Sequence, residues 1–179
     1  MLKRACVILL TTLALAGCDD DSPTAPSDPN VVVFTAQLSA QNEVPPITNA
    51  DSNARGDVRI TFNLTRDSSN NVTGGTATFV VNLNSFPTGT TWTLAHIHRG
   101  GSGVAGGVVV NTGLTPATAI TLATGTISNQ TFSNQPIVTS GQPDPALINE
   151  IISNPAGFYF NVHTALNGNG AVRGQLVKQ

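Results

Sequence analysis

Hydrophobic and polar residues alternate along much of the chain from residue 31 onward, which is typical of strands with one buried face. In the segment 57–64, for example, every second residue from Val58 to Leu64 is apolar. Segments of this kind, rich in Val, Thr, Ile and Phe, predict strands at 31–40, 57–66, 76–86, 91–98, 107–114, 157–164 and 171–178. Their number and the frequent turn residues between them predict an all-β fold, an antiparallel Greek-key-like β sandwich.

One segment departs from the period of two. The apolar residues of ALINEII (146–152) recur at helical spacing. Asp144 can cap such a helix, and Pro145 suits its first position, where the missing N–H costs nothing. Pro155 and Gly157 then stop it. We therefore expect one short helix near 144–153.

The first residues have the layout of an export signal. Lys3 and Arg4 precede an apolar run at 7–16, which is too short to span a bilayer as a helix. This is the layout of a secretory signal. The segment that follows, Leu15-Ala16-Gly17-Cys18, resembles the lipobox of bacterial lipoproteins. That resemblance implies a lipoprotein signal peptide at residues 1–17, cleavage before Cys18 and attachment of diacylglycerol to its sulfur.

The predicted signal peptide divides the rest of the chain into a tether and a folded domain. Residues 18–30 comprise the lipidated Cys18 and an acidic, proline-rich stretch without large apolar residues, which we expect to be a disordered tether. Residues 31–179 form the folded domain. Cys6 is removed with the signal, so the mature chain has no pair of cysteines for a disulfide. We expect a bacterial cell-envelope protein, anchored to the membrane by lipid and facing the periplasm or the cell surface.

The charge pattern excludes several classes of function. Acidic and basic residues are equally numerous beyond residue 31, so the domain lacks the basic footprint of a nucleic-acid-binding protein. The carboxylates are scattered, and no serine stands in a nucleophile elbow. Whether the protein is an enzyme stays uncertain, and the sequence favours a non-enzyme.

The chain has three histidines. Alternation places His96 and His98 on one face of their predicted strand, about 7 Å apart. In the strand at 157–164, the aromatic residues Phe158 and Phe160 share the core face, and His163 lies on the opposite face. If the two strands are neighbours, the three imidazoles could form one metal site, for which copper is ahead of zinc in affinity. Alternatively, each histidine could hydrogen-bond independently.

Three blocks of sequence, in order, resemble the CHRD domain, named from the chordin family and widespread in bacteria. They are FTAQLSAQNEVPP (34–46), AHIHRGGSGVAGGVVV (95–110) and GFYFNVHTALNGNGAVRGQL (157–176). In chordin this domain accompanies other modules that bind growth factors, and bacterial members resemble envelope proteins of unassigned role. The resemblance implies a non-catalytic binding or structural module, with an unknown protein or envelope partner.

A second, local resemblance concerns the segments around the histidines. AHIH with its glycine-rich loop, and NVHTALNGNGAVRGQL, are similar to the copper-site blocks of copper/zinc superoxide dismutases. This resemblance implies that His96, His98 and His163 are copper ligands and that Arg173 is an anion-guiding or second-shell residue. The fourth, bridging histidine, the zinc loop and the disulfide of that family are absent from the sequence. Only the copper half is therefore implied.

Three functions follow from these observations. The favoured one is a membrane-anchored, non-catalytic binding or structural module. The second is a copper site for metal handling or superoxide dismutase-like chemistry. The third is a metal-free adhesin, which the Thr- and Asn-rich surface would suit.

Overall fold

The computed structural model describes residues 28–179. The predicted signal peptide, the lipidated Cys18 and most of the tether therefore lie outside the described residues. The strands are β1 (Val31–Ser39), β2 (Arg55–Arg66), β3 (Val72–Asn84), β4 (Thr90–Arg99), β5 (Val108–Asn111), β6 (Ile120–Leu122), β7 (Ile127–Pro136), β8 (Val138–Thr139), β9 (Gln142–Pro143), β10 (Phe158–Thr164), β11 (Val172–Gln175) and β12 (Val177–Lys178). The α-helix is α1 (Pro145–Ser153).

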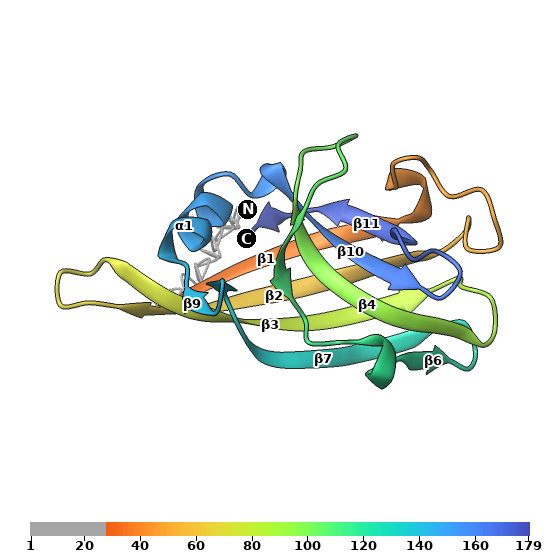
Figure 1. The fold of residues 1–179 in the computed structure, drawn as a ribbon, viewed down its shortest axis with the longest axis horizontal. Coiled ribbons are helices and arrows are strands. Elements are labelled where there is room, and N and C mark those ends of the chain that lie inside the picture. The colour runs from red at the N-terminus through yellow and green to blue at the C-terminus, as the bar shows by residue number, and fades with distance from the viewer. Residues whose placement is uncertain (1–27) are drawn as a thin grey trace, which may run out of the picture.

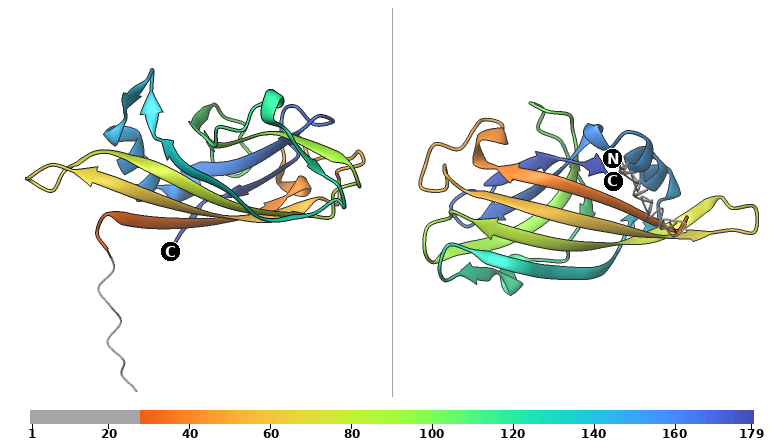
Figure 2. Two further views of the ribbon diagram at one scale, coloured as in Figure 1. Left: turned by 90° about the horizontal axis from the view of Figure 1, so that it is seen from below. Right: turned by 180° about the vertical axis from the view of Figure 1, so that it is seen from behind.

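Ten of these strands form one antiparallel sheet in the order β5-β4-β10-β11-β1-β2-β3-β7, with β6 attached to β4 and β12 to β1. The pair β8–β9 stands apart. The sheet is strongly curved and nearly closed, so β4 and β10 lie across from β1, β2 and β3 (Figures 1 and 2). The predicted all-β antiparallel sandwich with one short helix is confirmed, and its two layers are parts of one continuous sheet.

The core fills the space between these two layers. Phe79 of β3 and Phe160 of β10 pack with ring centroids 5.7 Å apart, so side chains from opposite layers meet. Phe34 and Phe62 form an edge-to-face pair at 5.0 Å. Such aromatic pairs stabilise by about 0.5–1.5 kcal/mol beyond the area that they bury. The strand face predicted to be apolar is therefore the one that forms the core.

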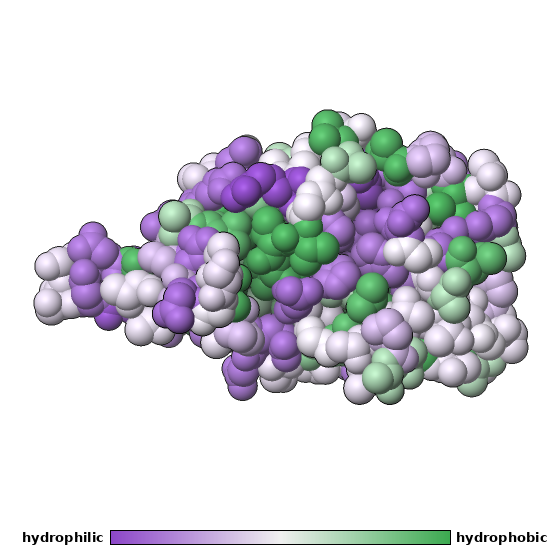
Figure 3. Space-filling model, in the orientation of Figure 1, coloured by the Kyte–Doolittle hydropathy of each residue, from purple (hydrophilic) through white to green (hydrophobic). Residues whose placement is uncertain are grey.

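Helix α1 confirms the predicted start and end signals. The Asp144 carboxylate accepts a hydrogen bond of 2.8 Å from the backbone N–H of Leu147, and Pro145 is the first helical residue. Leu147, Ile148 and Ile151 are buried against the rest of the domain. Hydrophobic residues also gather on the surface beside α1 (Figure 3). No helix in residues 28–179 is both long enough and apolar enough to cross a membrane.

The alternation fails at one point in β4. The pairing of β4 with β10 places Leu94 opposite His163 and Trp92 opposite Thr164, so Thr93 is an extra residue in a bulge. Strict alternation would place Trp92 on the same face as His96. Because the bulge reverses the face, Trp92 is instead fully buried in the core, where it packs edge-to-face on Phe132.

Candidate metal centre

The three histidines come from the neighbouring strands β4 and β10. In the antiparallel register His96 is opposite Asn161, His98 is opposite Tyr159, and Leu94 is opposite His163. Residues on one face of such a pair alternate with those on the other, so His96, His98 and His163 share a face. Phe158 and Phe160 occupy the core face. The histidines therefore lie on the outer face of β4 and β10, beneath loops.

The imidazoles converge on one point. One ring nitrogen from each histidine lies within 4.8 Å of the corresponding nitrogen of the other two. His96 Nδ1 and His163 Nε2 are 3.3 Å apart. The ring centroids are separated by 5.6 Å for His96 and His98, 5.1 Å for His96 and His163, and 5.7 Å for His98 and His163. The sequence predicted the shared face of His96 and His98, and the pairing of the strands brings His163 to them.

Two backbone carbonyls determine which nitrogens are available. His98 Nδ1 lies 2.9 Å from the carbonyl oxygen of Gly106, and His163 Nδ1 lies 3.0 Å from that of Gly168. A carbonyl can only accept, so each Nδ1 carries the proton and each Nε2 keeps its lone pair. This is the arrangement by which second-shell groups orient metal-ligating histidines.

These tautomers leave Nε2 of His98 and Nε2 of His163 as the available ligand atoms. His96 would use Nδ1, which faces His163. His98 Nε2 is buried and has no hydrogen-bond partner among the described residues. A buried polar atom without a partner costs about 1–3 kcal/mol, so native proteins rarely keep one without a reason.

The distances suit a metal after a small adjustment. Two nitrogens that each bind one ion at about 2.0–2.1 Å can be at most about 4.2 Å apart. The separation of 3.3 Å between His96 and His163 is within this limit. A pair at the 4.8 Å bound of the group would have to approach by about 0.6 Å for both nitrogens to bind one ion.

Burial keeps the three rings neutral. It is the main cause that lowers the pKa of His96 to about 4, and the imidazoles of His163 and His98 add to the effect. Burial also lowers the pKa values of His98 and His163, against the opposing effect of their hydrogen bonds to Gly106 and Gly168. The neutral imidazole is the form that binds metals. The site is therefore in its ligating state at neutral pH.

Arg173 reaches the site through Tyr159. Strand β10 lies between β4 and β11, and Tyr159 has neighbours on both sides. Its ring stacks on that of His98 at 4.9 Å with an angle of 10° between the planes. The Arg173 guanidinium lies 4.3 Å from the centre of the same ring. Arg173 thus supports a ring that in turn supports His98.

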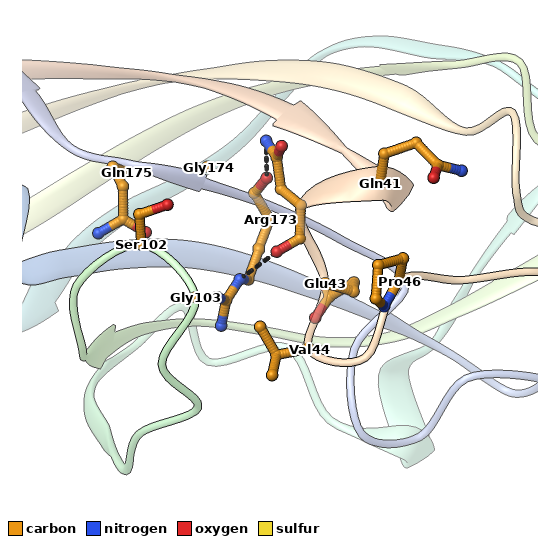
Figure 4. Close-up of a pocket in the computed structure, with 10 residues that line it drawn as sticks. Gln41, Glu43, Val44, Pro46, Ser102, Gly103, Arg173, Gly174 and Gln175 are labelled. Atoms are coloured by element: carbon orange, nitrogen blue, oxygen red, sulfur yellow. Dashed lines mark hydrogen bonds between the residues drawn. The ribbon is translucent and has the colours of Figure 1, made fainter.

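Arg173 also ties two loops together. Its Nε donates to the carbonyl oxygen of Asn42 at 2.7 Å, and its Nη1 donates to that of Val104 at 2.9 Å. Figure 4 shows its guanidinium between the loop of Ser102 and Gly103 and the side chain of Val44. These residues line a pocket of about 520 Å³. The structure supports a positioning role, and the anion-guiding role of Arg173 stays a prediction.

Glu43 is the buried acid of this region. It lines the same pocket, and one of its oxygens, Oε1, is buried without a hydrogen-bond partner in the described part of the chain. Burial raises the pKa of Glu43 to about 7, although the charge of Arg173 opposes the shift. Glu43 does not belong to the group of converging ligand atoms.

Sequence reasoning missed a carboxylate that supports His163 from a distance. Asp51 is buried, and its Oδ2 accepts hydrogen bonds from Thr164 Oγ1 at 2.8 Å and from Asn167 Nδ2 at 2.6 Å. Both donors belong to the turn that carries Gly168, whose carbonyl orients His163. Asp51 is far from His163 in sequence, so no local spacing could reveal the link.

The comparison with family models gives one clear result. Residues 34–176 match the model of the CHRD domain. The chain belongs to the CHRD family. No curated protein and no solved structure matches it. The CHRD match includes the three histidines and Arg173 but brings no cofactor with it, so the case for a metal depends on the geometry of this site.

Proposed function

We propose that this CHRD domain is a non-catalytic copper-binding module of the cell envelope, with His96, His98 and His163 as ligands. One observation carries the proposal. Three buried imidazoles present nitrogen atoms to one another within 4.8 Å, and the Nε2 atom of His98 has no hydrogen-bond partner among the described residues.

Independent hydrogen bonding accounts less well for the cluster. It explains Nδ1 of His98 and Nδ1 of His163, which donate to carbonyls. Without metal, His96 Nδ1 can also donate to His163 Nε2. Independent hydrogen bonding leaves His98 Nε2 buried without a partner among the described residues, whereas a metal ion would satisfy all three nitrogen lone pairs at once.

The donor set favours copper among the common ions. Imidazole nitrogen suits copper, zinc, iron and nickel, while magnesium and calcium require oxygen ligands. Copper is the most strongly bound of the divalent first-row ions at nitrogen sites. The group contains only histidines, without the carboxylates expected of a calcium or magnesium site.

The location in the cell envelope is a separate part of the proposal. It is supported by the order of basic residues, apolar run and Leu15-Ala16-Gly17-Cys18 in the sequence. Two or more acyl chains hold a domain at a membrane durably. A Cys18→Ala variant should therefore lose labelled fatty acid and leave the membrane fraction. Retention of both would contradict the anchor while leaving the copper proposal intact.

Metal content tests the copper site. The chain, expressed with its own N-terminal segment and purified in detergent, is incubated with copper, passed through a desalting column and analysed for metal and protein. We expect one copper per chain, and on the order of a tenfold or greater loss of affinity in His98→Ala. Thr121→Ala, an exposed change on β6, is the control and should keep its copper. Sub-stoichiometric copper in the unmodified chain would overturn the proposal.

A further inference from the structure

The candidate site offers ligands that carry no charge. The converging group consists of three histidines, with no cysteine or carboxylate among the described residues within the same reach. The Tyr159 hydroxyl is already used, since it accepts a hydrogen bond of 3.1 Å from the backbone N–H of Gly106. A bound ion would therefore keep its full charge inside the protein.

Solvent has little access to this point. The residues His96, His98 and His163 are 8%, 7% and 5% exposed, and the accepting nitrogen of His98 is buried. The carbonyl of Gly106 in one loop accepts a hydrogen bond from the His98 ring, and the carbonyl of Gly168 in a turn accepts one from the His163 ring. A water molecule would have difficulty completing a fourth coordination position.

A positive charge also lies beside the site. Arg173 stacks on Tyr159, which stacks on His98. The only salt bridge among the described residues, Arg99 with Glu150, does not involve Arg173. Moving an ion from water into a protein interior costs a free energy that grows with the square of its charge, so a dication costs about four times as much as a monocation. Arg173 adds to the cost for both ions.

These observations discriminate between metal ions. Zn²⁺ in proteins keeps four ligands, and Cu(II) prefers a tetragonal set of nitrogen and oxygen ligands. Cu(I) is a soft monocation that is stable with three ligands. We infer that the three-histidine site takes copper as three-coordinate Cu(I), in preference to Cu(II) and Zn²⁺. The inference rests on the proposed copper-binding function and adds the oxidation state.

Competition under anaerobic conditions tests this preference. The full chain in detergent competes with a coloured Cu(I) chelator in the presence of ascorbate, and separate titrations use Cu(II) and Zn²⁺ without reductant. We expect one Cu(I) per chain and an affinity on the order of a hundredfold or more above that for Zn²⁺, because the dication is penalised by burial. Equal or tighter binding of Cu(II) or Zn²⁺ would overturn the inference but leave metal binding intact. Failure to bind any of the three would overturn both.

Two variants sharpen the test. Cys6→Ser combined with Cys18→Ser removes both cysteine thiols of the full-length chain, which could bind Cu(I) instead, and it should leave the Cu(I) affinity unchanged. If Cu(I) binding is lost, the site is at cysteine and the inference is wrong.

Asn161→Asp places a carboxylate opposite His96 on the same face, at a buried residue whose Oδ1 has no partner in the described chain. It should raise the affinity for Zn²⁺ relative to Cu(I), and an unchanged ratio in a folded variant would contradict the charge argument.

Discussion

The Nδ1 atom of His96 lies 3.3 Å from the Nε2 atom of His163, although the two residues are 67 positions apart in sequence. The antiparallel pairing of β4 with β10 brings them together, and the carbonyl of Gly168 fixes the tautomer of His163. We therefore expect changes at residues that bind no metal themselves to affect metal binding.

The first prediction concerns the loop over His98. A Cβ atom on Gly106 would overlap with the carbonyl oxygen of Arg99, so Gly106→Ala must displace the loop. The displacement moves the carbonyl that orients His98 and the N–H that binds the Tyr159 hydroxyl. We expect copper affinity to fall about tenfold or more, the usual effect of losing an outer-sphere contact.

The neighbouring residue provides the control for this change. A Cβ atom on Gly107 meets nothing within 4 Å, so Gly107→Ala should bind copper like the unmodified chain. Isothermal titration of both variants measures the difference. Equal affinities for the two variants would show that the Gly106 carbonyl does not orient a ligand.

The second prediction concerns Asp51. Asp51→Ala leaves the buried hydroxyl of Thr164 and the amide of Asn167 without their acceptor, which should cost about 1–3 kcal/mol in the free energy of unfolding. Because these groups hold the turn of Gly168, copper affinity should also fall by about tenfold to a hundredfold.

A second aspartate separates positioning from stability. Asp144→Ala removes the cap of α1 and should cost about 1 kcal/mol of stability without changing copper affinity. Urea unfolding and copper titration are measured on both variants. If copper affinity merely follows stability across the two, Asp51 has no specific positioning role.

The third prediction is the pH dependence of stability without metal. The pKa of His96 falls from 6.5 to about 4 on folding, so between these values the unfolded chain binds more protons than the folded one. The free energy of unfolding is therefore independent of His96 above pH 6.5, and it falls as the pH drops from 6.5 towards 4. The lowered pKa values of His98 and His163 act in the same direction.

Glu43 opposes this trend in the same range. Its pKa rises from 4.5 to about 7 on folding, so its contribution is present below pH 4.5 and is lost as pH rises through 7. Because the two contributions oppose each other, the histidine effect is isolated in Glu43→Gln, whose stability should fall from pH 7 to pH 5. Urea unfolding at intervals of half a pH unit measures it. A stability of this variant that rises towards pH 5 would contradict the assignment.

Much of the fold could be predicted because local patterns are strong in this chain. Alternation predicted the core face of the strands at 57–66 and 157–164, and the cap and proline predicted the start of α1. Strand β7 was not predicted, since its sequence ISNQTFSNQP is polar and is paired on one edge only, to β3. At an edge strand, backbone pairing forms without the apolar pattern that identifies a central strand.

The candidate site could be predicted only in part. The spacing of His96 and His98 fixed their common face, but whether β10 lies next to β4 depends on the order of the whole sheet. The tautomers depend on carbonyls of two loops, and Asp51 acts through contacts distant in sequence. Interactions of this kind leave no local periodicity, so the ligand atoms could not be assigned before the structure.

X-ray absorption at the copper edge tests the central claim most directly, since it measures the donor atoms and their distances to the metal. For the full chain loaded with one equivalent of copper, the account predicts three nitrogen donors at about 2.0 Å with the outer scattering of imidazole rings. In His163→Gln the imidazole contribution should fall by about a third, because one of three equivalent donors is lost. A spectrum dominated by sulfur or by non-imidazole oxygen, or one unchanged by loss of His163, would contradict it.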